Sequence, residues 1–178
     1  VSDGWQFYIR KFDSADAKHI ETLVTHPGRG IVIEFLHSIV LGEVNYVVSG
    51  DMGSGKTTME KALIGFMNPQ YTIRTAETSF ELNLNNLYPE RDIHAMQERG
   101  DVTIYDILEA SKKMDADIMV VGEVNAPKIA GAFVQVAQSG SRIATTTLHH
   151  KTTEALIEYF RNALVEMFGI NDVLIAEK

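Results

Sequence analysis

The stretch VVSGDMGSGKTTMEKAL, Val47 to Leu63, decides the fold, because a glycine-rich turn separates an apolar run from a helical one. Four of its residues match the pattern G-x-x-x-x-G-K-[ST], with a strand before and a helix after, as the pattern requires. Glycines let backbone N–H groups curl around an anion, and the following helix adds its positive dipole end. The predicted phosphate-binding loop consists of Gly50, Asp51, Met52, Gly53, Ser54, Gly55, Lys56, Thr57 and Thr58.

Two side chains of this loop have predicted roles. Lys56 can reach the β- and γ-phosphates of a nucleotide, and the Thr57 hydroxyl can ligate Mg²⁺. A glycine-rich turn without a ligand is the weaker interpretation, because four specified positions occur in the required context. Nucleotide binding is therefore the strongest prediction that the sequence carries.

Length and composition limit the kinds of protein that this chain can be. Its 178 residues suffice for one sizeable core. A net charge of -8 argues against a broad electrostatic grip on nucleic acid, and zero cysteines exclude disulfides and thiolate metal sites. No apolar run reaches the ~20 residues that a transmembrane helix needs. The sequence opens on Val1 rather than Met, so we expect a domain of a longer protein.

Short apolar runs alternate with helical patterns after residue 43. This alternation predicts an α/β fold with a mostly parallel sheet and helices on both faces. The expected strands are Val44–Val48, Tyr71–Ala76, Ile118–Val121 and Ile143–Leu148. The expected helices are Lys56–Met67, Thr103–Met114 with a capping-box start, one opened by Asn125 and Pro127, and Thr153–Phe168 closed by Gly169.

The flanking segments are predicted with fewer cues. Trp5–Phe12 has partial strand alternation, Ser14–Val24 favours a helix, and Ile31–Leu41 favours a buried helix. Within Tyr71–Gly100 the stretch LNLNNLYPERD indicates an extended or looped excursion.

Carboxylates follow two of the predicted strands. Glu123 comes directly after the strand Ile118–Val121, at the carboxyl end, where open α/β sheets place ligands, so we expect it to hold Mg²⁺ or its water. Asp117, at the other end of that strand, favours a solvated turn. Glu77 and Glu81 follow the strand Tyr71–Ala76, and either could orient or deprotonate a water molecule; spacing alone also allows surface positions.

Two histidines, His149 and His150, follow the strand Ile143–Leu148. A histidine at the end of a parallel strand could sense a γ-phosphate or contact a neighbouring subunit. On residue type alone, a structural or exposed histidine is the more ordinary interpretation.

Four stretches in this order resemble the secretion and pilus-assembly ATPases of the type II and type IV machines, with the closest likeness to the CpaF-like tight-adherence pilus ATPases. SGDMGSGKTT resembles their phosphate loop, and TIRTAETSFELNL their acidic box. MDADIMVVGEV is similar to their strand ending in Gly-Glu, and SGSRIATTTLHH to their histidine box. The likeness spans roughly Phe7 to Met167.

The resemblance implies a RecA-like core that works as a hexameric ring with ATP and Mg²⁺ between subunits. It implies a water-activating role for Glu81, a Mg²⁺-linked role for Glu123, and a γ-phosphate-linked role for His149. Arg99 resembles an arginine that reaches nucleotide within the ring. It also implies a strand or linker over residues 1–12 from a preceding domain, and an ATPase domain over residues 13–178 that lacks its C-terminal part.

The resemblance further implies a cytoplasmic protein, peripheral at the membrane face, whose partner is the inner-membrane platform protein of a pilus or secretion machine. Three positions depart from the family pattern, namely Thr78, Asn125 and Ser141. These departures keep open a nucleotide-gated assembly module with little turnover. A P-loop small-molecule kinase is a third hypothesis, although Arg91 and Arg99 are the only arginines between the acidic box and the Gly-Glu strand.

Overall fold

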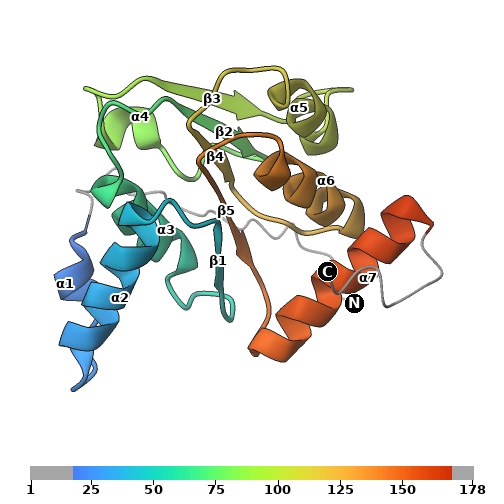
Figure 1. Cartoon of the computed structure of the whole chain (residues 1–178). Helices are drawn as coiled ribbons and strands as arrows, with labels where there is room; N and C mark the ends of the chain where they lie inside the picture. Colours follow the sequence, from blue (N-terminus) through green and yellow to red (C-terminus); the bar gives the residue numbers. More distant parts are fainter. Residues whose placement is uncertain (1–17, 170–178) are drawn as a thin grey trace, which may run out of the picture.

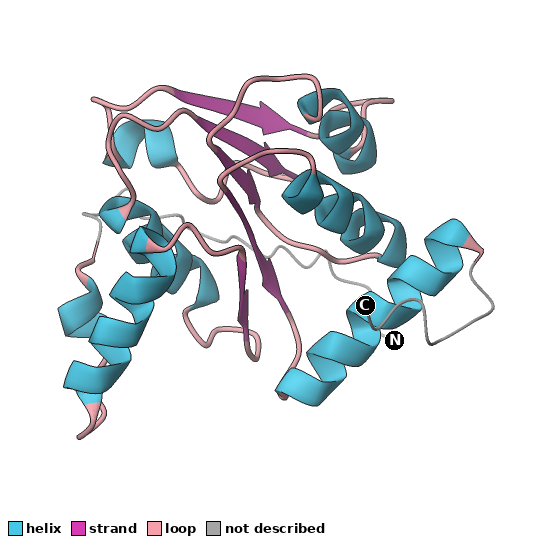
Figure 2. Cartoon of the chain, viewed as in Figure 1, coloured by secondary structure: helices cyan, strands magenta, loops and turns pink. Residues whose placement is uncertain are grey.

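Helices and strands alternate along residues 18–169, the part of the chain that the computed structural model describes (Figures 1 and 2). The strand expected over residues 5–12 lies outside this range. The strands are β1 (Tyr46–Ser49), β2 (Ile73–Glu77), β3 (Ile93–Gln97), β4 (Ile118–Val121) and β5 (Ile143–Leu148). The helices are α1 (Ile20–Leu23), α2 (Arg29–Leu41), α3 (Lys56–Phe66), α4 (Leu84–Leu87), α5 (Ile104–Ser111), α6 (Pro127–Gln138) and α7 (Thr153–Phe168).

The strands form one parallel sheet in the order β1-β5-β4-β2-β3. Its register places Ile93, Ile73, Ile118 and Ile143 in one row across four strands. Every residue of β4 and β5 is buried, as expected for parallel strands that are covered on both faces. The predicted α/β fold with a RecA-like core is confirmed.

Helices cover both faces of the sheet (Figure 1), and each face has its own apolar core. On one face, α1, α3 and α4 pack against β2, β4 and β5, with Ile64 and Ile118 among the fully buried side chains. On the other face, α5, α6 and α7 enclose Leu108 and Ala130. The site at the strand ends therefore rests on a sheet that is held from both sides.

The ends of the later helices follow the sequence cues. Thr103 and Asp106 form the predicted capping box at the start of α5. Pro127 occupies the first turn of α6. Gly169 ends α7 with a φ of 62°, a left-handed backbone conformation that favours glycine.

Two predictions for the earlier segments were wrong. The helix over Ile31–Leu41 is present as α2, but it is not buried, because Ile31 is 78% exposed and Phe35 is 62% exposed. The stretch LNLNNLYPERD, expected to be extended or looped, holds the short helix α4, and the edge strand β3 that follows it was not predicted. An edge strand has one partner and a partly wet face, so β3 lacks the apolar run by which the buried strands were recognised.

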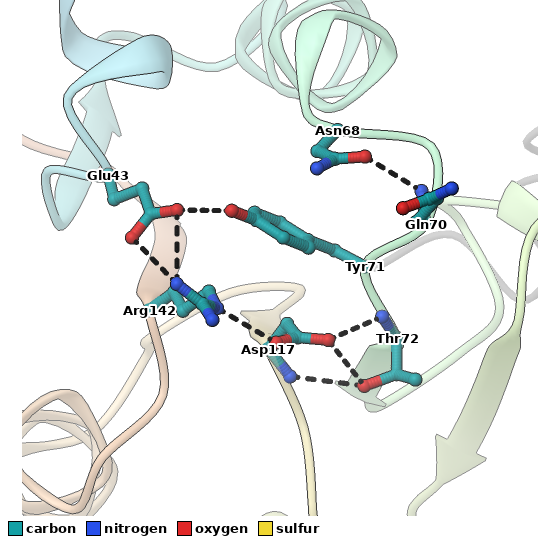
Figure 3. A network of polar contacts seen from close by, with 7 residues as sticks. All are labelled: Glu43, Asn68, Gln70, Tyr71, Thr72, Asp117 and Arg142. Atoms are coloured by element: carbon teal, nitrogen blue, oxygen red, sulfur yellow. Dashed lines mark hydrogen bonds and ion pairs between the residues drawn. The ribbon is translucent and has the colours of Figure 1, made fainter.

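A polar network joins four loops at the end of the sheet opposite the phosphate loop (Figure 3). Arg142 contacts Asp117 through Nε at 3.0 Å and Glu43 through Nη1 at 3.3 Å, and its guanidinium lies over the ring of Tyr71. Asp117 also accepts from the backbone and hydroxyl of Thr72 at 3.0 and 3.2 Å. The prediction of Asp117 as a solvated turn residue was therefore wrong, because its carboxylate ties the strands β2, β4 and β5 together.

We expect Arg142→Ala to lower the urea denaturation midpoint slightly, since half-exposed ion pairs contribute little individually and this residue makes several contacts. Urea denaturation at low salt measures the loss. The difference between the variant and the wild type should shrink in 1 M NaCl, because salt screens exposed charges. An unchanged denaturation midpoint at low salt would show that the network adds no stability.

A buried carboxyl lies beneath the phosphate loop. Glu60 of α3 is fully buried and accepts a hydrogen bond from the Thr145 hydroxyl of β5 at 2.7 Å. The Tyr46 hydroxyl lies near its second oxygen, and neither atom has a well-formed hydrogen bond among the described residues. Burial without a cation raises the pKa of Glu60 from the usual 4.5 to about 7.

This raised pKa predicts a pH-dependent stability. Between about pH 4.5 and pH 7 the folded state keeps the proton on Glu60 while the unfolded state releases it, so the free energy of unfolding falls as the pH rises. The loss is about 3 kcal/mol over this range. Glu60→Gln stays neutral, so subtracting its stability from that of the wild type at pH 5 and pH 8 isolates the effect. Equal pH slopes in the two proteins would contradict the assignment.

Candidate functional site

The phosphate loop connects β1 to α3, and its backbone requires glycine at two positions. Gly55 precedes the first residue of α3 with a φ of 90°, which side-chain-bearing residues rarely adopt. Gly53, within the loop, has a φ of 76° and so also lies in the left-handed region. The two glycines therefore allow the turn to fold tightly over the N-terminus of α3, where free N–H groups can bind an anion.

The ammonium of Lys56 is directed back into this loop. Its Nζ donates to the carbonyl oxygens of Gly50 at 3.1 Å and Asp51 at 2.9 Å. Its third contact is the Nδ1 atom of His149 at 3.0 Å. The side chain is only 9% exposed, so a buried cation is presented at the centre of the loop.

His149 joins the phosphate loop to the Gly-Glu strand. Its Nε2 lies 2.9 Å from Oε1 of Glu123, while its Nδ1 faces Lys56. Because a lysine ammonium only donates, Nδ1 must accept, and Nε2–H then donates to the carboxylate. The two contacts fit a neutral His149 that carries its proton on Nε2.

These residues border a cleft of about 700 Å³ at the carboxyl ends of the strands. The predicted residues in its lining are Met52, Gly53, Gly55, Lys56, Thr57, Thr58, Glu77, Glu81, Glu123 and His149. Ligands bind at this edge of open parallel sheets, and here β1, β2, β4 and β5 all deliver side chains or loops to it. Thr57 and Glu123, the predicted Mg²⁺ residues, share this cleft.

Glu77 and Glu81 occupy different environments. Glu77 ends β2, is 2% exposed, and accepts hydrogen bonds from the Thr75 hydroxyl and from the N–H groups of Glu81 and Leu82. Burial raises the pKa of Glu77 despite these bonds. Glu81 is half-buried at the cleft. Lys61 of α3 is near both carboxylates, which raise its pKa, although desolvation lowers it by more.

Four further predicted residues lie at the margin of the cleft or outside it. The side chain of Asp51 pairs with Lys151 at 3.5 Å on the surface. Gly50 and Ser54 border a second cleft of about 460 Å³ on the other side of the loop, together with Leu23 and Met59. Arg99 follows the edge strand β3, is exposed, and does not belong to the lining of either cleft.

Sequence reasoning missed several residues that shape the cleft. Ser79, Leu82, Gly122 and Thr147 also border it. The hydroxyl of Thr147 donates to the carbonyl of Gly122 at 2.8 Å, which ties the end of β5 to that of β4. The repeated threonines of β5 were the available signal, because polar residues in a fully buried strand need partners.

Within residues 18–169, no group of three or more His, Asp or Glu side chains is arranged to hold a metal ion by itself. None of the helices in this range combines the length and the apolar character that a membrane crossing demands.

The sequence and the fold were compared with known proteins. A family model described as "Type II/IV secretion system protein" matches residues 2–176. The "Protein VirB11" of Agrobacterium fabrum is 31% identical over 131 residues, covering 72% of this chain and 38% of that protein. The "Putative type II secretion system protein E" of Escherichia coli is 27% identical over 162 residues, covering 90% of this chain and 29% of that protein. The chain thus spans well under half the length of these relatives.

Two solved structures of secretion and pilus proteins have a similar fold. The VirB11 ATPase from the Brucella suis type IV secretion system, in complex with sulphate, superposes with a TM-score of 0.73 at 25% identity, covering 88% of this chain and 46% of that one. The pilus retraction motor PilT with bound ADP has a TM-score of 0.65 at 23% identity, covering 91% of this chain and 44% of that one; this likeness concerns the fold alone.

Proposed function

This chain belongs to the type II/IV secretion system protein family, and on that premise we propose that it is the ATP-hydrolysing domain of a motor that powers pilus assembly or secretion. The observation that carries the proposal is the convergence of Lys56, Glu123 and His149 on one cleft beside the phosphate loop. The similar structure described as a VirB11 ATPase in complex with sulphate agrees with a phosphate-binding role for this cleft.

ATP is the proposed substrate. The backbone N–H groups of the loop and the Lys56 ammonium bind its β- and γ-phosphates, and Lys56 exchanges its loop carbonyls and His149 for phosphate oxygens. The second cleft, which Leu23, Val48 and Met59 line beside the same loop, receives the nucleoside. These apolar side chains offer contact area to a base, as ligand sites commonly do.

Mg²⁺ fits the donor set of the cleft. The Thr57 hydroxyl and the Glu123 carboxylate are oxygen donors, and Mg²⁺ commonly takes one or two such protein ligands together with phosphate oxygens. When bound, the ion neutralises negative charge on the phosphates. His149 holds the Glu123 carboxylate at the cleft through its Nε2–H.

Glu81 is the proposed general base. Its carboxylate takes a proton from a water molecule whose oxygen bonds to the γ-phosphorus, while the bond from phosphorus to the β–γ bridging oxygen breaks and ADP leaves with the electron pair. The presence of Glu81 in the lining of the same cleft as Lys56 supports this role. His149 responds to the γ-phosphate, because the Lys56 ammonium that contacts His149 is the same group that binds this phosphate.

We extend the proposal to the assembly. Arg99 is exposed and away from both clefts of its own chain, which suits a side chain that reaches nucleotide in a neighbouring subunit of a homo-hexamer. The ring then acts at the cytoplasmic face of the membrane on the platform protein of a pilus or secretion machine. Residues 13–178 are the proposed ATPase domain, with residues 1–12 leading into it.

The test is steady-state phosphate release by the full-length protein with ATP and Mg²⁺. We expect turnover that rises with protein concentration as rings form. Tight ATP binding combined with release no faster than the background would replace the motor by the nucleotide-gated assembly module. Phosphate transfer to a nucleotide or sugar acceptor would instead indicate a kinase.

A further inference from the structure

The two glutamates of the acidic box differ in what their carboxylates contact. The Oε1 atom of Glu77 accepts from the Thr75 hydroxyl at 2.9 Å, and its Oε2 accepts from the N–H groups of Glu81 and Leu82, each at 2.9 Å. Three donors therefore occupy a carboxylate that is 2% exposed. This leaves Glu77 poorly placed to take a proton from water or to approach an ion.

The backbone of Glu77 is fixed as firmly as its side chain. Its carbonyl accepts from the N–H of Glu98 at 2.9 Å, and its register partner on β3 is Gln97. The amide of Gln97 also donates to the carbonyl of Thr78 at 3.2 Å. The strand end and both ends of the segment 78–82 are thus anchored around one carboxylate, and Glu81 lies within that segment.

Gly122 provides the room for this carboxylate. A Cβ at this position would lie 3.1 Å from Cγ of Glu77, closer than side chains normally approach. The glycine of the Gly-Glu strand end therefore lets the Glu77 side chain lie against the backbone that follows β4. A packing requirement at Glu77 explains why a glycine precedes Glu123.

We propose that Glu77 is a positioning residue: its carboxylate binds the backbone N–H groups of Glu81 and Leu82 and so directs the Glu81 side chain into the cleft. Glu77 itself contacts neither the attacking water nor Mg²⁺. The inference rests on the proposed function, because it assigns the acidic pair within the same site. It also gives different roles to Glu77 and Glu81, which the sequence pattern does not distinguish.

The neutral isostere separates positioning from chemistry. In Glu77→Gln, the amide oxygen can accept from both N–H groups while the NH₂ group donates to Thr75, so the segment keeps its shape. We expect kcat for ATP within ~3-fold of wild type in this variant. Glu77→Ala leaves the Leu82 N–H without its acceptor and leaves the Glu81 N–H with the carbonyl of Ser79 alone, so we expect it to lower kcat ~30-fold or more at similar KM. If Glu77 were instead the general base or an ion ligand, both variants would lose ATPase activity.

Amide hydrogen exchange tests the same proposal without turnover. In the nucleotide-free chain, the amide of Leu82 should be protected in the wild type and in Glu77→Gln, and should exchange ~10-fold faster or more in Glu77→Ala. If Glu77→Ala fails to fold, Gly122→Ala serves instead, because its Cβ displaces Glu77. Loss of activity in Glu77→Gln, or unchanged exchange in the Ala variants, would overturn the proposal. A wild type without turnover but with the expected exchange would refute only the proposed function.

Discussion

Replacing Glu81 by Gln is expected to lower kcat for ATP hydrolysis by roughly 10²–10⁴-fold, the usual contribution of a positioned general base. Glutamine has the same size and keeps the backbone bond to Glu77, so the change removes the proton acceptor without moving the segment 78–82. ATP affinity should stay within ~3-fold, because the phosphates are bound by the loop on the other side of the cleft. Single-turnover phosphate release and equilibrium nucleotide binding measure the two quantities separately.

The control for this substitution is Glu90→Gln, at an exposed turn before β3 and outside the cleft lining. It removes the same charge and should leave kcat unchanged. Equal rates in Glu81→Gln and the wild type would take Glu81 out of the chemistry. The role of general base would then fall to Glu77 at the end of β2, although three hydrogen bonds already occupy its carboxylate.

Replacing Lys56 by Ala is expected to lower kcat/KM for ATP by about 10³-fold or more. Charge-assisted hydrogen bonds to phosphate contribute about 1.5–3 kcal/mol to binding, and a donor aimed at transition-state charge contributes a further 10²–10³ in rate. The fold should survive, because the contacts of the ammonium are loop carbonyls and His149 rather than the core. Calorimetric titration with ATP measures the loss of affinity, and phosphate release measures the loss of rate.

Lys151 offers a matched control. It carries the same charge close to the same loop, where it pairs with the exposed carboxylate of Asp51 at 3.5 Å. A surface pair of this kind contributes ~1 kcal/mol at most, so Lys151→Ala should stay within a few-fold of the wild type in affinity. Similar losses in both lysine variants would mean that general positive charge, rather than the geometry of Lys56, binds the phosphates.

The phosphate loop and its flanking elements could be predicted because each local cue is strong by itself. The glycines, the strand before them and the helix after them all lie within Val47–Leu63. The strands β4 and β5 were found with their observed bounds, since a run that is apolar or Thr-rich at every position indicates a strand buried on both faces.

The failures concern features that depend on distant residues. The turn at Asp117 is not solvated, because its partners Thr72 and Arg142 are 45 and 25 residues away in the sequence. The helix α2 has an apolar composition, but no element of the described chain covers Ile31 or Phe35. No local pattern states which face of a helix meets the core when apolar residues surround it.

The sequence predicts that the strand ends meet at the site, but it does not predict which side chains contact one another there. Lys56 and His149 are 93 residues apart, and only the strand order brings β5 next to β1. The difference between Glu77 and Glu81 is equally invisible in the sequence. It arises because the chain turns after β2, so that the carboxylate of Glu77 accepts hydrogen bonds from the turn while Glu81 is less buried, although both residues border the cleft.

The central claim is that this cleft binds ATP through the loop Gly50–Thr58. A crystal structure with a non-hydrolysable ATP analogue and Mg²⁺ tests it most directly. The account predicts phosphates within hydrogen-bond distance of the loop N–H groups and of Lys56 Nζ, with the 3.0 Å contact between Lys56 and His149 broken. An analogue bound elsewhere, with Lys56 still donating to Gly50, Asp51 and His149, would contradict it.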